Sequence, residues 1–366
     1  MADRALHIGI DGRELQGKPT GVGRYLLSIL RVWAADAVSP HRYTVFLPAE
    51  PSASLKALGE RVTWSVHPTA RPGTLWEQTR LAEAVKSTSP DVYFGPGYTA
   101  PLRLDPPSVV AVHDVSFFAH PEWFTPRERL RRQWATRAAA MRARRVVTVS
   151  RFSAGEIVRW LGVPRERIVV APNAAFEVRR PDPLPARGPI ALFVGSLFNR
   201  RRIPDLLRAF AAAGAQVPDA RLVLIGDNRT HPRIDPREIA AELGIAARVD
   251  WREYVGDADL EAAYWNARVF LFLSDYEGFA ITPLEALAHD VPPILLDTAV
   301  AREIYGDAAR LVPPDASAIA LALTTLLTDD AAHADLLAKG RRRLSAFSWT
   351  ATAATVREAI EQAAVE

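Results

Sequence analysis

A pair of glutamates, Glu277 and Glu285, carries the strongest chemical signal in the sequence. Glu277 and Gly278 follow a predicted buried strand, Val269–Leu273, and the helix predicted after them runs through Leu287. Backbone N–H groups at a helix N-terminus suit a phosphate. A carboxylate one turn into the helix can hold a ribose diol, and an acid at the start of the loop can meet a sugar hydroxyl or a developing positive charge. These residues predict a site for a phosphorylated ligand.

The same stretch also has a structural explanation. Thr282, Pro283 and Glu285 match a capping box, with threonine as the N-cap and proline at the first helical position. This pattern accounts for Glu285 without any ligand. It leaves the carboxylate and glycine at Glu277 and Gly278 unexplained.

A second cluster follows the predicted strand Ile190–Val194. It begins with the small residues Gly195 and Ser196 and continues to Arg200 and Arg201. Small residues at the end of a strand let the backbone approach a ligand, and two arginines can clamp a diphosphate. A solvated charge run is the alternative, but the carboxyl end of a parallel strand favours a binding role.

Polar residues also follow two strands predicted in the first half. His113 and Asp114 come directly after Val109–Val112, and Ser150 ends the strand Val146–Ser150. A single histidine is as often structural as functional. Position at the carboxyl edge of the sheet makes all three candidates for contact with a ligand.

Gly21 and Gly23 form a turn between the first predicted strand and the first helix. The pattern lacks the third glycine of a dinucleotide fingerprint, because Leu26 stands there, and this argues against a nicotinamide enzyme.

Two further patterns favour structural roles. Ser153 and Glu156 match a capping box, and Asp257 or Asp259 is expected to be an N-cap rather than a metal ligand. The histidines show no convincing metal-binding spacing.

Composition limits the class of protein. The chain has 366 residues, enough for two domains, and 49% of them are hydrophobic. The absence of cysteine excludes disulfide scaffolds, cysteine nucleophiles and thiolate metal sites. No secretory signal or membrane-spanning run is visible, so we expect a soluble, cytoplasmic protein.

Short β-branched runs alternate with helical stretches, which predicts two doubly wound parallel sheets. The predicted strands not yet named are His7–Asp11, Tyr43–Leu47, Leu222–Ile225 and Ile294–Leu296. The proline-rich stretch near Arg179–Pro189 is interpreted as a linker. The predicted organisation is a domain at 1–178, a linker at 179–188, a second domain at 189–346 and a C-terminal helix at 347–366.

Taken together, the motifs resemble retaining glycosyltransferases of family 4, which have the GT-B fold. The resemblance covers nearly the whole chain and rests on IDGRELQGKPTGVGRY, HDVSFFAHPEWF, VVTVSRFS, APN, FVGSLFNRRR, YVGDADLEAAYWNARVFLF, SDYEGFAITPLEALAHDVP and the final FSW. It implies two Rossmann-like domains facing a central cleft, with the C-terminal helix returning to the N-terminal domain. The opening GKPTGVGRY is most similar to the branch that contains O-antigen mannosyltransferases.

The resemblance implies roles for individual residues. Glu277 would contact the transferred sugar, and His113 would approach that sugar and its leaving phosphate. Arg200, the third catalytic candidate, matches the family's phosphate arginine. The first domain would bind the acceptor through Gly23, Tyr25, Asp114 and Ser150. The second would bind the donor, and the complete donor-binding set is Gly21, Gly23, Gly195, Ser196, Arg200, Arg201, Val255, Gly278, Phe279, Ala280, Ile281, Thr282 and Glu285.

Several positions depart from the family pattern. Arg201 replaces the usual lysine and Leu273 the usual proline. Glycine is typical at four positions that hold other residues here, namely Ala174, Glu253, Ala280 and Asp290. Glu253 lies near the expected base site, where Val255 would flank the base, and could alter nucleotide choice.

The expected activity is retaining transfer of a hexose, with mannose from GDP-mannose as the leading hypothesis. The acceptor would be a glycan or lipid-linked glycan in the synthesis of a cell-surface polysaccharide such as lipopolysaccharide. Other GDP- or UDP-sugars stay open. The resemblance implies no metal and no cofactor beyond the nucleotide sugar. A GT-B epimerase or phosphorylase is the nearest alternative.

Eight arginines and one acid, Glu128, lie between Arg127 and Arg145. With Trp123, Phe124 and Trp134, they could rest on anionic headgroups at the inner face of the plasma membrane. A solvated helix is the alternative. A nucleic-acid binder is a rival explanation of the same cluster, but the net charge of only +3 argues against it.

Overall fold

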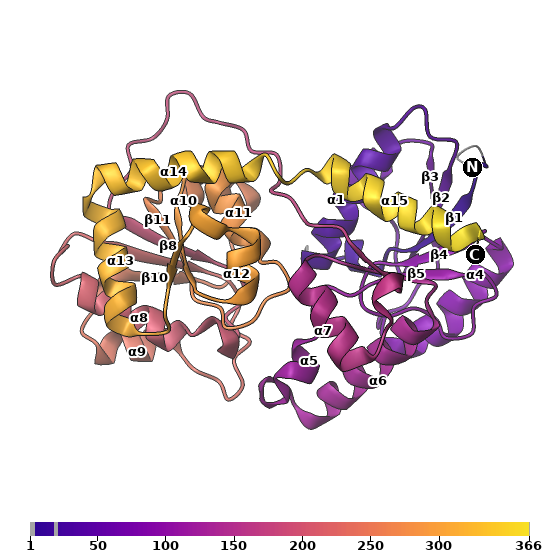
Figure 1. Ribbon diagram of the computed structural model, residues 1–366, viewed down its shortest axis with the longest axis horizontal. Helices are drawn as coiled ribbons and strands as arrows, with labels where there is room; N and C mark the ends of the chain where they lie inside the picture. Colours follow the sequence, from indigo (N-terminus) through magenta and orange to yellow (C-terminus); the bar gives the residue numbers. More distant parts are fainter. Residues whose placement is uncertain (1–3, 18–20, 366) are drawn as a thin grey trace. The chain divides into compact units, whose positions relative to one another are not determined.

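The computed structural model describes residues 4–17 and 21–365. The chain divides into two compact units (Figure 1). Unit 1 comprises Met1–Asn173 together with Ser348–Glu366, and unit 2 comprises Ala174–Phe347.

Unit 1 is built on a seven-stranded parallel sheet in the order β3-β2-β1-β4-β5-β6-β7. The order reverses between β1 and β4, which is the doubly wound arrangement. The strands are β1 (His7–Asp11), β2 (Arg42–Leu47), β3 (Val62–Val66), β4 (Val92–Gly95), β5 (Ser108–Ala111), β6 (Arg145–Thr148) and β7 (Ile168–Val170).

Helices cover both faces of this sheet. The longer ones are α1 (Gly21–Ala35), α4 (Ala82–Thr88), α6 (Pro126–Arg142), α7 (Arg151–Leu161) and α15 (Trp349–Val365). The short ones are α2 (Ala53–Lys56), α3 (Thr74–Trp76), α5 (Ser116–Ala119), η1 (Arg13–Leu15), the π-helical η2 (Glu77–Leu81), η3 (Pro121–Trp123) and η4 (Arg165–Arg167). Alternate strand residues feed two cores, one against α1 and α15 and the other against α4, α6 and α7.

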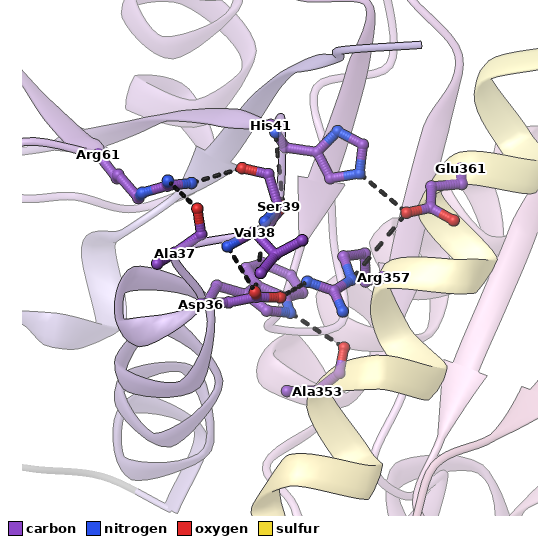
Figure 2. Close-up of polar contacts among 10 residues, drawn as sticks. Asp36, Ala37, Val38, Ser39, His41, Arg61, Ala353, Arg357 and Glu361 are labelled. Carbon is purple, nitrogen blue, oxygen red and sulfur yellow. Dashed lines mark hydrogen bonds and ion pairs between the residues drawn. The ribbon is translucent and has the colours of Figure 1, made fainter. Parts of the chain in front are cut away.

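The C-terminal helix α15 packs against α1 in unit 1 and thereby confirms the predicted return (Figure 1). Figure 2 shows the polar contacts that hold it. His41 Nε2 lies 2.8 Å from Glu361, and Arg357 lies 2.5 Å from Asp36. The buried indole of Trp33 donates to the carbonyl of Ala353 at 3.0 Å.

Unit 2 contains a six-stranded parallel sheet in the order β10-β9-β8-β11-β12-β13. Its strands are β8 (Ile190–Val194), β9 (Arg221–Ile225), β10 (Val249–Arg252), β11 (Val269–Phe272), β12 (Pro293–Leu296) and β13 (Arg310–Val312). Its helices are α8 (Ile203–Ala213), α9 (Pro236–Glu242), α10 (Asp257–Asn266), α11 (Ile281–Ala288), α12 (Ala299–Ile304), α13 (Ala316–Thr328), α14 (Asp330–Leu344), η5 (Asn199–Arg201), η6 (Ala246–Arg248) and η7 (Gly306–Ala308).

The proline-rich stretch contains no helix or strand, but it falls within unit 2 rather than between the units. Its Arg187 donates to the carbonyls of Ala267 at 3.1 Å and His289 at 2.5 Å. The predicted first domain therefore ends five residues too late, because unit 1 ends at Asn173 and not at 178.

All the predicted strands are present, and their ends agree with the structure to within two residues. The prediction missed β3, β4, β7, β10 and β13, which are short or contain polar residues. No helix in residues 4–17 and 21–365 is both long and apolar enough to cross a membrane.

Candidate functional site

Glu277 lies in the loop between β11 and α11, where three side chains converge on one of its carboxylate oxygens. Nε of Arg200 and Nε of Arg201 each lie 3.3 Å from Oε1, and the Ser274 hydroxyl donates to the same atom at 2.8 Å. The two arginine side chains are 14% and 12% exposed, and that of Glu277 is 12% exposed. The structure thus brings together the two clusters that the sequence analysis treated separately.

The protonation state of Glu277 follows from these neighbours. Burial alone would raise its pKa, but the charges of Arg200 and Arg201 and the Ser274 hydrogen bond outweigh it and lower the pKa. Glu277 is therefore a carboxylate at neutral pH. Two arginines against one carboxylate leave a local excess of positive charge, which suits an anion.

Gly195 has a φ of 137°, a left-handed conformation that side chains rarely adopt. The sequence predicts that the backbone here approaches a ligand. In the structure the guanidinium of Arg201 lies over this glycine and donates to the carbonyl of Ser196 at 2.8 Å. Gly195 therefore makes room for the arginine.

The start of α11 differs from the predicted capping box. The N-cap is Ala280 rather than Thr282, and its side chain makes no capping bond. Thr282 Oγ1 is buried and has no hydrogen-bond partner in the part of the chain that is described. The helix therefore begins at Ile281, directly after Ala280, which has a φ of 63° and whose carbonyl accepts a hydrogen bond from the Tyr305 hydroxyl.

Glu285 is 5% exposed and accepts a hydrogen bond from the Tyr264 hydroxyl at 3.0 Å. The ring of Tyr264 stacks on His289 at 4.7 Å. Within α11, Glu285 stands five residues after the N-cap, so it does not close a capping box. The structural role of Glu285 is thus to accept a buried hydrogen bond from Tyr264, and not to cap the helix.

The other predicted donor residues differ in how far they are buried. Phe279 is 3% exposed and packs edge-on against Phe347 at 5.5 Å, while Gly278 is buried beside it. Val255 is half-buried, and Glu253 is exposed.

His113 in unit 1 lies after β5, with its Nε2 2.8 Å from the carbonyl of Pro96. A carbonyl only accepts, so Nε2 carries the proton of this bond. Burial lowers the pKa of His113, against the opposing effects of the Pro96 bond and Asp114. The neutral ring then presents Nδ1 as an acceptor. Asp114 accepts from the Tyr98 hydroxyl at 3.0 Å.

Two residues predicted on the acceptor side are buried instead. Tyr25 is 1% exposed, and its ring packs edge-on against His113 at 4.8 Å. Ser150 is fully buried and is the N-cap of α7, accepting from the N–H of Ser153 at 3.0 Å. Ser153 is therefore not the cap, and its hydroxyl donates to the carbonyl of His113 at 3.2 Å.

Gly21 and Gly23 do not form a turn before the first helix. Both belong to the first turn of α1, which begins at Gly21. The preceding residues 18–20 of the GKPTGVGRY motif lie outside the described residues. The predicted glycine loop is therefore wrong for these two positions.

Comparison with known proteins decides the family. Residues 19–175 match the family model described as Glycosyltransferase Family 4, and residues 175–343 match the model described as Glycosyl transferases group 1. The O-antigen chain mannosyltransferase B of Escherichia coli is 30% identical to this chain over 74% of each protein. The chain belongs to glycosyltransferase family 4.

Further relatives of this family 4 glycosyltransferase are also mannosyltransferases. An MMP alpha-(1->4)-mannosyltransferase of Mycolicibacterium hassiacum is 29% identical over 60% of this chain and 54% of its own length. Among solved structures, Anabaena Alr3699/HepE in complex with UDP and glucose has a TM-score of 0.76 at 19% identity, covering 98% of this chain and all of that one. That similarity shows the GT-B fold, in agreement with the two parallel sheets.

Two departures of this glycosyltransferase from the family's usual glycines have a backbone consequence. Ala280 and Asp290 both have positive φ, at 63° and 57°. Asp290 is held there by ion pairs with Arg341 at 2.9 Å and Arg180 at 3.5 Å. Ala280 has no side chain that could compensate in this way.

The aspartates of α10 are not N-caps. Gly256 is the N-cap, and Asp257 and Asp259 lie in the first turn, where carboxylates favour the helix dipole. The residues that the structure describes contain no group of three or more potential metal ligands.

Sequence reasoning missed several residues around these sites. Tyr98, Tyr264 and Tyr305 bind named candidates through their hydroxyls, and Arg13 joins Asp11 to Glu77. Arg13 lies within the quoted IDGR motif, which was the only available signal. The local sequence around a tyrosine does not indicate which residue its hydroxyl will hydrogen-bond in the folded protein.

Proposed function

We propose that this glycosyltransferase transfers a hexose, with mannose from GDP-mannose as the leading candidate, and retains the anomeric configuration. The acceptor would be a glycan or lipid-linked glycan of a cell-surface polysaccharide. The observation that carries the proposal is the convergence of Arg200, Arg201 and Ser274 on Glu277 at the carboxyl end of β11.

The proposed chemistry needs an anion clamp and a group for the sugar. Arg200 and Arg201 would neutralise the diphosphate as the bond from the anomeric carbon to its phosphate oxygen breaks. The first N–H groups of α11, at Ala280, Ile281 and Thr282, would add donors, because a helix start leaves such groups without intrahelical acceptors. Glu277 would orient the sugar, and its ionised form would favour positive charge at the anomeric carbon.

Retention follows if the acceptor hydroxyl attacks from the face that the diphosphate leaves. The new bond joins the acceptor oxygen to the anomeric carbon, and the hydroxyl proton passes to the departing phosphate oxygen. No metal is needed in this scheme, because guanidinium groups and helix N–H groups carry the anion's charge. Glu285 would bind the ribose, and Val255 would flank the base.

Unit 1 would supply His113 and Asp114. A neutral His113 with Nδ1 as acceptor suits a sugar hydroxyl better than a phosphate, which has no proton to donate at neutral pH. This refines the role that the family resemblance implied for His113. Asp114, held by the Tyr98 hydroxyl, would accept from a hydroxyl of the acceptor.

The donor choice is supported by the relatives' names. Besides the two mannosyltransferases, a GDP-mannose:cellobiosyl-diphosphopolyprenol alpha-mannosyltransferase of Xanthomonas campestris is 27% identical over 54% of this chain. The solved HepE structure, in contrast, contains UDP. GDP-mannose therefore ranks first, and UDP-sugars are the rivals to include in a test.

The deciding experiment is a thermal-shift panel of GDP, UDP, ADP and their hexose conjugates with EDTA present. A ligand at 100 times its dissociation constant adds about 2.7 kcal/mol to stability. We expect a selective shift with GDP and GDP-mannose, followed by transfer to a mannose-containing acceptor with an α-linked product by NMR. A shift with UDP-sugars alone would reject the donor, and a requirement for metal would reject the metal-free scheme.

A second proposal concerns peripheral membrane contact through Arg127–Arg145. On α6, Leu130, Trp134 and Met141 are 59%, 61% and 46% exposed. They recur at helical spacing, and exposed arginines stand among them at 127, 131, 137 and 142. An apolar stripe flanked by arginines fits an anionic lipid surface. We expect binding to vesicles containing anionic lipid and its loss when these arginines become glutamates. Unchanged binding by that variant would reject this surface.

A further inference from the structure

A buried cluster of charges lies at the carboxyl end of β1, outside the residues assigned above. Arg13 Nη2 is 2.6 Å from Asp11 and 2.9 Å from Glu77. The side chains of Arg13, Asp11 and Glu77 are only 13%, 3% and 2% exposed. The guanidinium forms ion pairs with both carboxylates, and these pairs stabilise charges that would destabilise the fold if they were buried alone.

Arg13 also binds a neutral partner in a different segment. Its Nη2 donates to the Thr99 hydroxyl at 3.2 Å. Thr99 ends the turn that follows β4, and this turn is tight, since a Cβ on Gly95 would lie 2.5 Å from the Thr99 carbonyl. Tyr98, just before it, has a φ of 70°. A non-glycine residue in that conformation persists when its surroundings hold it.

The π-helical η2 holds the same segment on its other side. Glu77, its first residue, binds Arg13, and Gln78 donates to the carbonyl of Ala100 at 3.2 Å. Gln78 also accepts from the N–H of Leu102 at 2.9 Å. Single π turns inside helices occur frequently at functional sites.

The turn held in this way makes direct contact with the functional candidates of unit 1. The carbonyl of Pro96 accepts the proton of His113 Nε2 at 2.8 Å. The ring of Tyr98 lies 5.5 Å from that of His113, and its hydroxyl binds Asp114. Arg13 is therefore connected to His113 by one turn of five residues, from Gly95 to Thr99.

We propose that Arg13 is a positioning residue, which through Thr99 and the turn at 95–99 sets the orientation of His113 and Asp114. This inference rests on the proposed transferase function for its kinetic consequence, but its structural part does not. Asp11 and Glu77 keep the guanidinium in place, and the guanidinium keeps the turn in place. None of the three needs to touch a substrate.

Two variants test the connection without leaving an uncompensated buried charge. Thr99→Val removes the hydroxyl and leaves the Arg13, Asp11 and Glu77 cluster intact. Arg13→Lys keeps the charge but cannot span three partners with one planar group. The matched controls lie away from the turn at 95–99. Thr352→Val removes a hydroxyl that donates to the carbonyls of Ser348 and Pro172. Arg61→Lys changes a guanidinium that donates to the carbonyls of Ala37 and Ser39 (Figure 2).

The first readout is the ¹⁵N NMR spectrum of the histidine rings, with His113 assigned from the loss of its signals in His113→Gln. We expect Thr99→Val and Arg13→Lys to shift the His113 ring resonances and its titration, while both controls leave them unchanged. The second readout is kcat, which we expect to fall by roughly tenfold, with KM for the donor nearly unchanged, because small misplacements far from the chemistry are costly.

The two readouts separate the possible failures. An unchanged His113 spectrum in Thr99→Val and Arg13→Lys overturns the positioning role, whatever the activity. A shifted His113 spectrum with an unchanged kcat shows that Arg13 positions His113 but overturns the proposed effect of this positioning on catalysis. If the wild-type chain transfers no sugar under any condition, the proposed function fails, and the spectra alone decide the structural part.

Discussion

Arg201 fills the space that any side chain at Gly195 would need, since a Cβ built on Gly195 would lie 2.1 Å from Nη1 of Arg201. The arginine is anchored there by Glu277 on one side and the carbonyl of Ser196 on the other. Glycine at this strand end is thus a requirement of the arginine clamp.

Gly195→Ala should therefore displace Arg201 and strain the backbone. We expect a loss of roughly 1–3 kcal/mol in stability from the φ of 137° and a marked loss of affinity for nucleoside diphosphates. Chemical denaturation and calorimetric titration with GDP measure the two effects. Gly244→Ala, at a φ of 68° with open space around it, is the control for strain alone. Equal GDP affinity in both variants would contradict the clamp.

Glu277→Gln should abolish most activity while the fold persists. The amide keeps the shape but removes the charge that faces Arg200 and Arg201, and we expect kcat to fall by roughly 100-fold or more. Asp275→Asn is the matched control, since Asp275 lies in the same loop, is 36% exposed and pairs with Arg202. We expect it to stay within a few-fold of wild type. Near wild-type turnover by Glu277→Gln would exclude the proposed site.

The half-buried His113 should make stability depend on pH in a defined direction. Its pKa is lowered from 6.5, chiefly by burial, so the folded state binds fewer protons than the unfolded state near pH 6. The stability it contributes is fully present above pH 6.5 and is lost as the pH falls through the folded pKa. Relative to His113→Gln, the wild-type free energy of unfolding should therefore be level above pH 6.5 and decline as the pH falls below it. Parallel curves for the two proteins would refute this.

Ala280→Gly should stabilise the chain. Ala280 holds a φ of 63°, which costs an L-residue about 1–2 kcal/mol, and glycine removes that cost while adding freedom to the unfolded chain. We expect a net gain of up to about 1 kcal/mol by chemical denaturation. Ala286→Gly, in the interior of the same helix α11, should instead lose at least about 1 kcal/mol. A loss of stability in Ala280→Gly would show that the strain is absent.

Much of the fold could be predicted because the determining signals are local. Runs such as Ile190–Val194 and Val269–Phe272 are buried on both faces, so hydrophobic character alone marks them as central strands. Strands with polar positions, such as Val62–Val66 and Val249–Arg252, lack that mark and were missed. The return of α15 to unit 1 came from the family resemblance, and no local pattern in that helix predicts its partner.

Some features of the candidate site could likewise be predicted from the sequence, and others could not. The types and strand-end positions of Glu277, Arg200 and His113 could be predicted from the sequence, because each follows a hydrophobic strand and so lies at the carboxyl edge of its own parallel sheet. Which residue caps a helix could not. Thr282 and Ser153 were predicted as N-caps, but the N-caps in the structure are Ala280 and Ser150. The path of the chain that enters the helix decides which residue takes this position.

The sequence by itself determined the alternation of elements and the chemistry available at their ends. Only the tertiary structure decided which distant groups share a proton or a charge. Arg13 and Glu77 are 64 residues apart, and Arg201 and Glu277 are 76 apart. Such pairs form because folding removes these charges from water, and a buried charge is stable only beside the partner that the packed chain brings to it.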